Sequence, residues 1–570
     1  MTSHMSKFQQ GTSRLFKAGM MFGITALVVL LAACGGGSTP AQNSGPHILT
    51  IGVSPAGDWT RNFNPLLSNG NGGNLFGTDG LLYEPLMFFN QLQPGSTSPL
   101  LATSYQLSTD GKQLTIHLQS DVKWSDGKAF SSADVVFTFN YMIQHDSEGV
   151  DQTGLKSFVK DVSAPDANTV VVDFNAPSSS NVWYLVGQTY IIPQHVWQGI
   201  STPAKYSNDN PVGTGPFVLK SFAPQVYKLG KNSNFRNAGS VKVDEVDYPA
   251  FESNTSGTTL LAQGSIDWTG LFVADIQHVY IDRDPSHNVF YSPGVQTTML
   301  LMNMKNPLFQ DLNVRKAISA ALNRAQYSQV AESGYQTVAN PTGLVLPIFQ
   351  SYLNPSITAT YTGPQASQSA QLLQGDGYSK DGNGYFAKNG KELAFSLMAP
   401  NGWSDWNQME TMIQTDLKAA GIKVNVQEPA QSDWFTKVAN GNFETTLRWT
   451  NHGPSPFYMY NALLSSSFSA PIGSGAVSNM QRWEDKNTDS LLSQYANSTD
   501  PNVQKQAIYG LEQIMVNQVP VIPLLDGSDW NEYTTARFTG WATAQNPYAL
   551  PAPFDAPDVE QTVLHLTPVS

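Results

Sequence analysis

The stretch DWNQMETMIQTDLKAAGIKVNV, residues 405–426, decides the fold class. Its apolar residues recur at the spacing of one helical face, as Met409 and Ile413 illustrate. Gly421 is a suitable end for this helix, because glycine adopts the left-handed backbone that helix ends require. Residues 422–426 then alternate between apolar and polar, as a half-buried strand does. A helix, a glycine and a strand in direct succession indicate an α/β fold.

Two further segments support this fold class. Residues 114–118 alternate as a strand, and Ser131 with Asp134 forms a capping pair before a helix with apolar residues on one face. Residues 314–322 show helical spacing as well, and Arg315 is interpreted as a structural ion-pair partner. The opposite, polar face of that segment carries Arg315, Lys316, Asn323 and Arg324.

Composition excludes several classes of protein. The chain has 570 residues, of which 41% are hydrophobic and 11% aromatic, so it can form a large core in more than one domain. The net charge is −13 and no basic cluster occurs, which argues against nucleic-acid binding. There is one cysteine, so an intrachain disulfide is impossible.

The first residues are predicted to be a lipoprotein signal peptide, 1–33. Three basic residues and no acidic one precede an apolar run that is slightly short for a membrane-spanning helix. The run ends in Leu-Ala-Ala-Cys, which resembles the bacterial lipobox, so Cys34 is the expected lipidation site. Residues 34–47 are rich in Gly, Ser and Pro and are expected to form a flexible tether.

Motifs for metal or nucleophilic chemistry do not occur in the sequence. The nine histidines lack zinc-site spacing, and no Gly-x-Ser-x-Gly elbow occurs. Residues 376–384 resemble a calcium loop loosely, but Tyr385 stands where an oxygen ligand is needed, which favours a glycine-rich turn. We therefore predict no metal and no cofactor, although scattered carboxylates could still meet in space as a catalytic pair.

A series of motifs resembles the family 5 extracellular solute-binding proteins, the peptide, nickel and oligosaccharide receptors of ABC importers. The motifs occur in the family's order at residues 100–105, 114–118, 122–127, 133–137, 192–197, 212–217, 264–268, 313–318 and 519–524. We interpret most of them as structural. Residues 213–216 are expected to form a turn that closes one lobe, and Trp124 and Trp268 are expected in the core.

The resemblance implies a type II periplasmic-binding-protein fold with two α/β lobes and a ligand enclosed between them. Lobe one would comprise residues 48–90, 205–303 and 528–570, with an extra subdomain at 91–204. Lobe two would comprise 304–527.

The stretch 448–456 bears on the ligand. Peptide-binding members place an aspartate there, which pairs with the peptide's amino terminus, but this chain has no acidic residue in the stretch. A buried ammonium without a carboxylate partner would cost several kcal/mol. Residues 401–406, 540–543 and 546–548 resemble the cello-oligosaccharide receptors of the family, where indole rings contact the apolar faces of sugars. The expected ligand-binding residues are Trp403, Trp406, Trp449, Asn451, His452 and Trp541.

The resemblance thus predicts a binding protein and not an enzyme. It would be a monomer, anchored by lipid on the outer face of the cytoplasmic membrane or in the periplasm, and would deliver a cellobiose-like oligosaccharide to ABC permease subunits. An oligopeptide receptor is the alternative, and His452 leaves a nickel or haem receptor open. A secreted carbohydrate-active hydrolase or an adhesion or signalling lipoprotein would belong to other classes.

Overall fold

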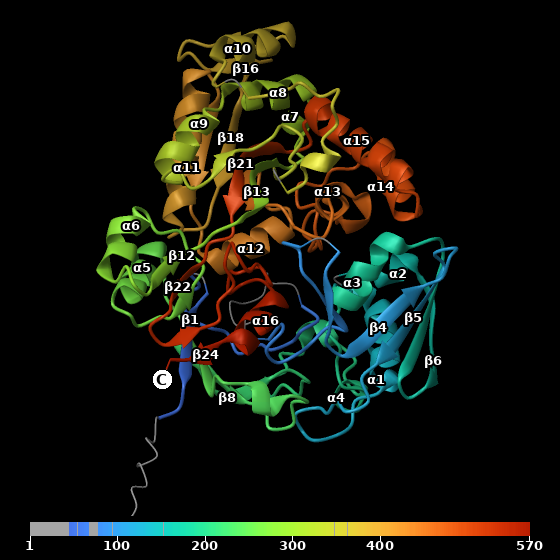
Figure 1. Ribbon diagram of the computed structural model, residues 1–570. Helices are drawn as coiled ribbons and strands as arrows, with labels where there is room; N and C mark the ends of the chain where they lie inside the picture. Colours follow the sequence, from blue (N-terminus) through green and yellow to red (C-terminus); the bar gives the residue numbers. More distant parts are fainter. Residues whose placement is uncertain are drawn as a thin grey trace, which may run out of the picture. The chain divides into compact units, whose positions relative to one another are not determined.

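The computed structural model describes residues 45–53, 55–67, 78–93, 95–151, 153–346, 348–361 and 363–569. The predicted signal peptide, Cys34 and nearly all of the tether lie outside these residues. Residues Pro46–Ser570 form one compact unit. Helices surround its three larger sheets (Figure 1).

The first sheet begins with the first described strand. Its strand order is β12-β22-β11-β1-β10-β9-β8, and β1 runs parallel to both β10 and β11. Leu49 and Ile51 of β1 are buried and lie two residues apart, so one face of this central strand packs into the core. The strands are β1 (Ile48–Gly52), β8 (Phe217–Ala223), β9 (Val226–Lys231), β10 (Glu245–Pro249), β11 (Trp268–Thr269), β12 (Asn288–Phe290) and β22 (Glu532–Thr534).

The second sheet has the order β14-β21-β13-β20-β18-β19. Its centre is antiparallel, with β13 between β20 and β21, whereas β18 runs parallel to β19 and β20. The strands are β13 (Gly294–Met302), β14 (Thr337–Val338), β18 (Ala394–Met398), β19 (Lys423–Gln427), β20 (Thr445–Trp449) and β21 (Ile522–Ser528).

A third, antiparallel sheet packs with helix α1 in the region predicted as the extra subdomain. Its order is β4-β5-β7-β6. The predicted capping box is confirmed, because Ser131 and Asp134 bond reciprocally to each other's backbone N–H groups at the start of α1. The elements are β4 (Ala102–Leu107), β5 (Gln113–Leu118), β6 (Val159–Asp166), β7 (Thr169–Phe174) and α1 (Ser132–Gln144).

Two neighbouring segments carry the chain between the first and second sheets. One joins β12 to β13 and the other joins β21 to β22. They are bonded side by side, since Asp529 N–H donates to the Pro293 carbonyl at 2.9 Å and the Ser292 hydroxyl donates to the Asp529 carbonyl at 2.7 Å. The chain changes sheet before β13, whereas the expected boundary at residue 303 follows it; the lobe boundaries stay predictions.

The remaining elements complete the lobes. The other α-helices are α2 (Leu155–Phe158), α3 (Val182–Gly187), α4 (Gln194–Trp197), α5 (Asn254–Ala262), α6 (Ile276–Val279), α7 (Pro307–Gln310), α8 (Leu312–Ala321), α9 (Arg324–Gln326), α10 (Ala366–Gly375), α11 (Ser404–Ala419), α12 (Gln431–Ala439), α13 (Pro456–Leu464), α14 (Lys486–Ala496), α15 (Pro501–Gln518) and α16 (Asp558–His565). Short strands are β2 (Met87–Phe89), β3 (Thr97–Pro99), β15 (Ser379–Lys380), β16 (Phe386–Lys388), β17 (Lys391–Glu392), β23 (Phe538–Thr539) and β24 (Thr567–Pro568).

Two large apolar cores correspond to the two lobes. One surrounds the second sheet, and the other joins the first sheet, the third sheet and the C-terminal helix α16. The fold is therefore the expected α/β, two-lobed type. None of the helices among the described residues is long and apolar enough to cross a lipid bilayer.

Helices α8 and α9 correct one prediction. Arg315 of α8 and Arg324 of α9, both expected on a polar face, are buried. Arg315 donates to backbone carbonyls, including those of Phe309 and Gln518, instead of to a carboxylate. Its structural role is confirmed, but the expected ion pair is wrong, because carbonyls at the end of α15 serve as acceptors.

The glycine-rich segment 213–216 has a structural role in the first lobe. A Cβ on Gly213 would lie 1.8 Å from the Leu82 carbonyl oxygen, and one on Gly215 would lie 2.4 Å from that of Leu81. Only glycine allows this close backbone approach. Neither glycine lines the cavity described below, which supports the interpretation as a structural turn.

Candidate ligand-binding site

A cavity of about 500 Å³ is lined by residues of both lobes. Residues Gly270–Phe272, which follow β11, and Asp555, which precedes α16, contribute from the first lobe. The start of α11 and the end of β20 contribute from the second lobe. The volume lies in the roughly 300–1,000 Å³ range of small-molecule sites.

An aromatic wall, defined as Trp403, Trp406, Phe435 and Trp449, covers the second-lobe side. The rings of Trp403 and Trp449 are stacked, with 6.0 Å between centroids and 22° between planes. Trp406 packs edge-on against Trp403 at 5.1 Å. Trp434 lies behind the wall, fully buried, and donates its indole N–H to Thr446 at 2.9 Å. The wall offers flat apolar surface, and the Trp403 indole N–H has no acceptor among the described residues.

A close contact between the lobes lies beside this wall. Asn254, the first residue of α5, donates its side-chain N–H to Asp405 and its backbone N–H to the Gly402 carbonyl, each at 3.1 Å. Gly402 has φ +86°, and a Cβ there would lie 2.9 Å from the Glu252 carbonyl oxygen. Glycine is required for both reasons. Burial raises the pKa of Asp405 to about 6.

Asn451 and His452 both line the cavity, as Trp403, Trp406 and Trp449 do. Asn451 is exposed, whereas His452 connects the lobes. His452 Nδ1 lies 2.7 Å from Gln91 Oε1, and Nε2 lies 3.6 Å from Asp555 Oδ1. Burial disfavours the charged imidazole, but the hydrogen bond and charge of Asp555 outweigh it and raise the pKa of His452.

Carboxyl groups of the first lobe face the same cavity. Asp79 and Asp555 both line it, and each has one oxygen without a hydrogen-bond partner. Burial raises the pKa of Asp79 to about 8. Asp558, next to Asp555, also has its pKa raised to about 8 by burial and by the Asp555 charge. The stretch 448–456 has no acidic residue, but Asp79 and Asp555 of the first lobe line the same cavity. The missing aspartate therefore does not exclude a cationic group in the ligand.

Trp541 lies apart from the other expected site residues. Its indole N–H donates to the Phe538 carbonyl at 2.9 Å, and its ring stacks on Tyr533 at 4.7 Å and packs edge-on against Trp268. It is buried and does not line the cavity. Trp268 and Trp124, expected in the core, are fully buried.

Sequence reasoning did not select Arg448, Phe435, Asp79, Asp555 or Trp530, all of which line the cavity. The sequence does point to Arg448 as a candidate binding residue, because it directly precedes Trp449 in the stretch 448–456. No sequence pattern marks Asp79 or Asp555 as a site residue, since they are far apart in the chain and no motif surrounds them. Among the described residues, no group of three His, Cys, Asp or Glu side chains is placed to hold a metal ion.

The model of the bacterial extracellular solute-binding proteins, family 5, middle region, matches residues 96–470. The chain belongs to this family. Its relatives in family 5 are named as binding proteins and not as enzymes.

Known relatives include a protein of Brucella ovis named for peptide binding by an ABC transporter. It is 28% identical over 348 residues, which cover 60% of this chain and 63% of that protein, so the alignment spans less than two thirds of the relative's length.

Solved family 5 structures share the fold at lower sequence identity. The mannohexaose-bound periplasmic oligopeptide-binding protein of Thermotoga maritima has a TM-score of 0.83 at 22% identity and covers 92% of this chain and 98% of its own. The oligopeptide-binding protein of Bacillus subtilis, in complex with a nonapeptide, has a TM-score of 0.78 at 19% identity, with 92% and 99% covered. These likenesses support the two-lobed fold.

Proposed function

We propose that this family 5 protein is the substrate-binding protein of an ABC importer and that its ligand is a short oligosaccharide of the cellobiose type. The observation that carries the proposal is the aromatic wall, in which Trp403 and Trp449 are stacked beside the cavity. Sugar rings present apolar C–H faces that pack on indoles, and their hydroxyls bond to polar groups at the edge. Trp403, Trp406, Trp449, Asn451 and His452 are the proposed contacts.

Several groups are available for the hydroxyls of such a ligand. The Trp403 indole N–H is an unused donor, and Asp79 and Asp555 each offer an unused oxygen. A protonated carboxyl both donates and accepts a hydrogen bond, and the raised pKa of Asp79 favours that form at neutral pH. The mannohexaose complex of the Thermotoga maritima neighbour is consistent with a sugar in this fold.

Transport would follow from closure of the two lobes. A ligand that touches both lobes stabilises the closed form by its differential affinity. The permease subunits would recognise that closed form, and the protein would remain in the cell envelope through the proposed lipid on Cys34. Replacement of Cys34 by Ala should release the protein from membranes, and continued membrane association would contradict lipidation.

An oligopeptide is the second candidate ligand. The unpaired oxygen of Asp555 favours it, because a carboxylate in the cavity stabilises an ammonium group. The relative of Brucella ovis is named for peptide binding.

A thermal-shift panel tests the ligand class. Cello-, xylo- and manno-oligosaccharides are compared with mixed tri- to hexapeptides, and we expect stabilisation by the sugars that is lost in Trp449→Ala. Stabilisation by peptides alone would overturn the sugar proposal. Incubation with labelled oligosaccharide should yield no shorter products, whereas turnover would indicate a hydrolase.

A further inference from the structure

Arg448 is a cation in the wall of the cavity. It lies on β20 next to Trp449, and its side chain helps to line the cavity. The guanidinium carbon lies 4.1 Å from the ring centroid of Trp449, 5.4 Å from that of Trp434 and 5.7 Å from that of Phe435. The aromatic wall therefore holds the guanidinium in place through cation–π contacts.

The guanidinium has no anionic partner among the residues that the structure describes. Its Nη1 is buried and has no hydrogen-bond acceptor. Burial lowers the pKa of Arg448 to about 10, so the side chain remains a cation at neutral pH. A buried charge without a partner is unfavourable, and an anion that enters the cavity would relieve the cost.

Other buried arginines of this protein differ from Arg448 because they have acceptors. Arg236 pairs with Glu84 at 2.7 Å. Arg315, Arg324 and Arg482 donate to backbone carbonyls. The unsatisfied donor is therefore specific to the arginine that faces the cavity.

We propose that Arg448 binds a carboxylate of the ligand. The ligand would then be an acidic oligosaccharide with a uronate group or a peptide with a free carboxylate. This inference rests on the proposed function, because it assigns a group of the ligand that the same cavity would enclose. A guanidinium binds a carboxylate through two parallel N–H donors, a geometry that a hydroxyl cannot match.

The opposite side of the cavity favours a carboxylate over a phosphate. One guanidinium neutralises the single charge of a carboxylate. A phosphate would bring a second negative charge into a cavity that the carboxylate of Asp555 also lines. Like charges at short range in a buried site repel strongly, so the dianion is disfavoured.

Matched ligand pairs test the proposal by isothermal titration calorimetry on the purified mature chain. One pair is xylotriose carrying a glucuronate and its methyl ester. The other is a tetrapeptide with a free carboxylate and its C-terminal amide. We expect the acid of at least one pair to bind about 30-fold more tightly than its neutral partner, as a charge-assisted hydrogen-bonded pair would give.

Variants assign that preference to Arg448. In Arg448→Gln the acid and neutral ligands should bind within about 3-fold of each other, and Arg448→Lys should restore part of the difference. Lys437→Gln removes one positive charge from α12 outside the cavity lining and should leave the preference unchanged. Circular dichroism of each variant checks that it is folded.

The possible results separate this inference from the proposed function. Equal binding of acid and neutral sugars by the wild type overturns the role of Arg448 and leaves the sugar proposal standing. An acid preference confined to the peptide pair overturns the sugar proposal and supports Arg448 as the carboxylate site. A preference that persists in Arg448→Gln, or the absence of binding in both pairs, overturns the inference.

Discussion

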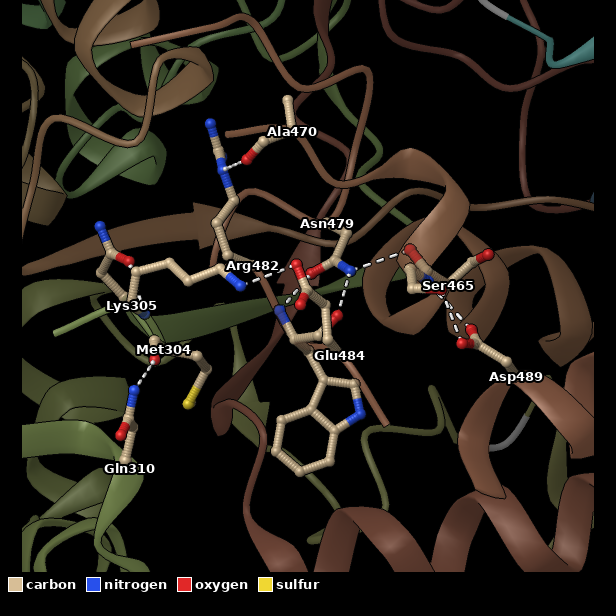
Figure 2. Close-up of polar contacts among 12 residues, drawn as sticks. Met304, Lys305, Gln310, Ser465, Ala470, Asn479, Arg482, Glu484 and Asp489 are labelled. Atoms are coloured by element: carbon tan, nitrogen blue, oxygen red, sulfur yellow. Dashed lines mark hydrogen bonds and ion pairs between the residues drawn. The ribbon is translucent and has the colours of Figure 1, made fainter. Parts of the chain in front are cut away.

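Two arginines of the second lobe, Arg482 and Arg448, lie in contrasting surroundings. Figure 2 shows Arg482, whose Nε donates to the Ala470 carbonyl at 3.0 Å, beside Asn479, which bonds to the Ser465 carbonyl at 2.9 Å. Its other nitrogens donate to the carbonyls of Met480, Ala439 and Ser474.

Burial lowers the pKa of both arginines to about 10, yet their hydrogen bonding differs completely. The donors of Arg482 are used within the protein and hold the loop between α13 and α14. The buried donor of Arg448 has no acceptor in the described part of the chain. Burial alone therefore does not reveal a binding residue, whereas burial together with an unused donor in a cavity does.

The largest effect on stability should come from Arg482→Met. The variant loses four charge-assisted hydrogen bonds and leaves buried carbonyls without donors, so we expect the free energy of unfolding to fall by about 3–5 kcal/mol. Chemical denaturation measures it. Arg448→Met, the matched control, should be as stable as the wild type or more so, because it removes an unpaired charge. Equal destabilisation by both variants would contradict the comparison.

A second test addresses the aromatic wall beneath Arg448. Trp449→Ala removes the stacking surface and the cation–π contact, and we expect ligand affinity to fall about 30- to 100-fold. Titration calorimetry measures it with the ligand that the panel identifies. Trp541→Phe changes an indole outside the cavity and should alter affinity less than about 2-fold. Comparable losses in the two variants would contradict the placement of the site.

A third test uses Glu410, a buried acid on α11. Burial and the charge of Glu428 raise its pKa to about 9. In the unfolded chain Glu410 has its ordinary, lower pKa and loses its proton at a lower pH than in the folded protein. The free energy of unfolding therefore falls as pH rises from about 5 to 9. Glu410→Gln should flatten this dependence and raise the free energy of unfolding at pH 7 by roughly 1–3 kcal/mol.

The control for Glu410 is a half-exposed acid in the same lobe. Glu484→Gln breaks a surface ion pair with Lys305 and should leave the pH dependence of the melting temperature unchanged. If Glu410→Gln showed the wild-type slope between pH 5 and 9, the raised pKa would be refuted.

The smallest expected effect concerns the contact between the lobes. Asn254→Ala removes the side-chain hydrogen bonds to Asp405 and Ser404, and we expect ligand affinity to fall about 3- to 10-fold while the melting temperature changes little. Thr259→Ala, on the same helix, loses a hydrogen bond within α5 alone and is the matched control. An unchanged affinity in Asn254→Ala would show that this contact does not stabilise the closed form.

Local features of the fold were predictable from sequence. The capping box at Ser131 and the succession of α11, Gly421 and β19 depend on residues that are neighbours in the chain. The positions of Arg315 and Arg324 were not predictable, because their acceptors come from distant segments. A helical periodicity shows which side chains share a face but not which carbonyls approach that face.

The site was predictable to the extent that it is local. Trp403 and Trp406 share one helix start, and Trp449, Asn451 and His452 share one loop, so one cluster of aromatic and polar residues identified each segment. Aromatic and polar residues also surround Trp541 in the sequence, but its side chain lies in the core. The acids of the first lobe reach the cavity only through the tertiary fold, which no pattern in the sequence reveals.

The contact of Asn254 with Asp405 and Gly402 has a kinetic consequence. It joins the start of α5 to the loop that positions Trp403, so the lobes cannot separate without breaking it. A ligand that contacts both lobes loses its contacts with one of them on that separation. The residence time of the ligand then depends on the lifetime of the closed protein. Weakening the Asn254 contact would shorten the time in which a permease can bind the ligand-bound, closed form.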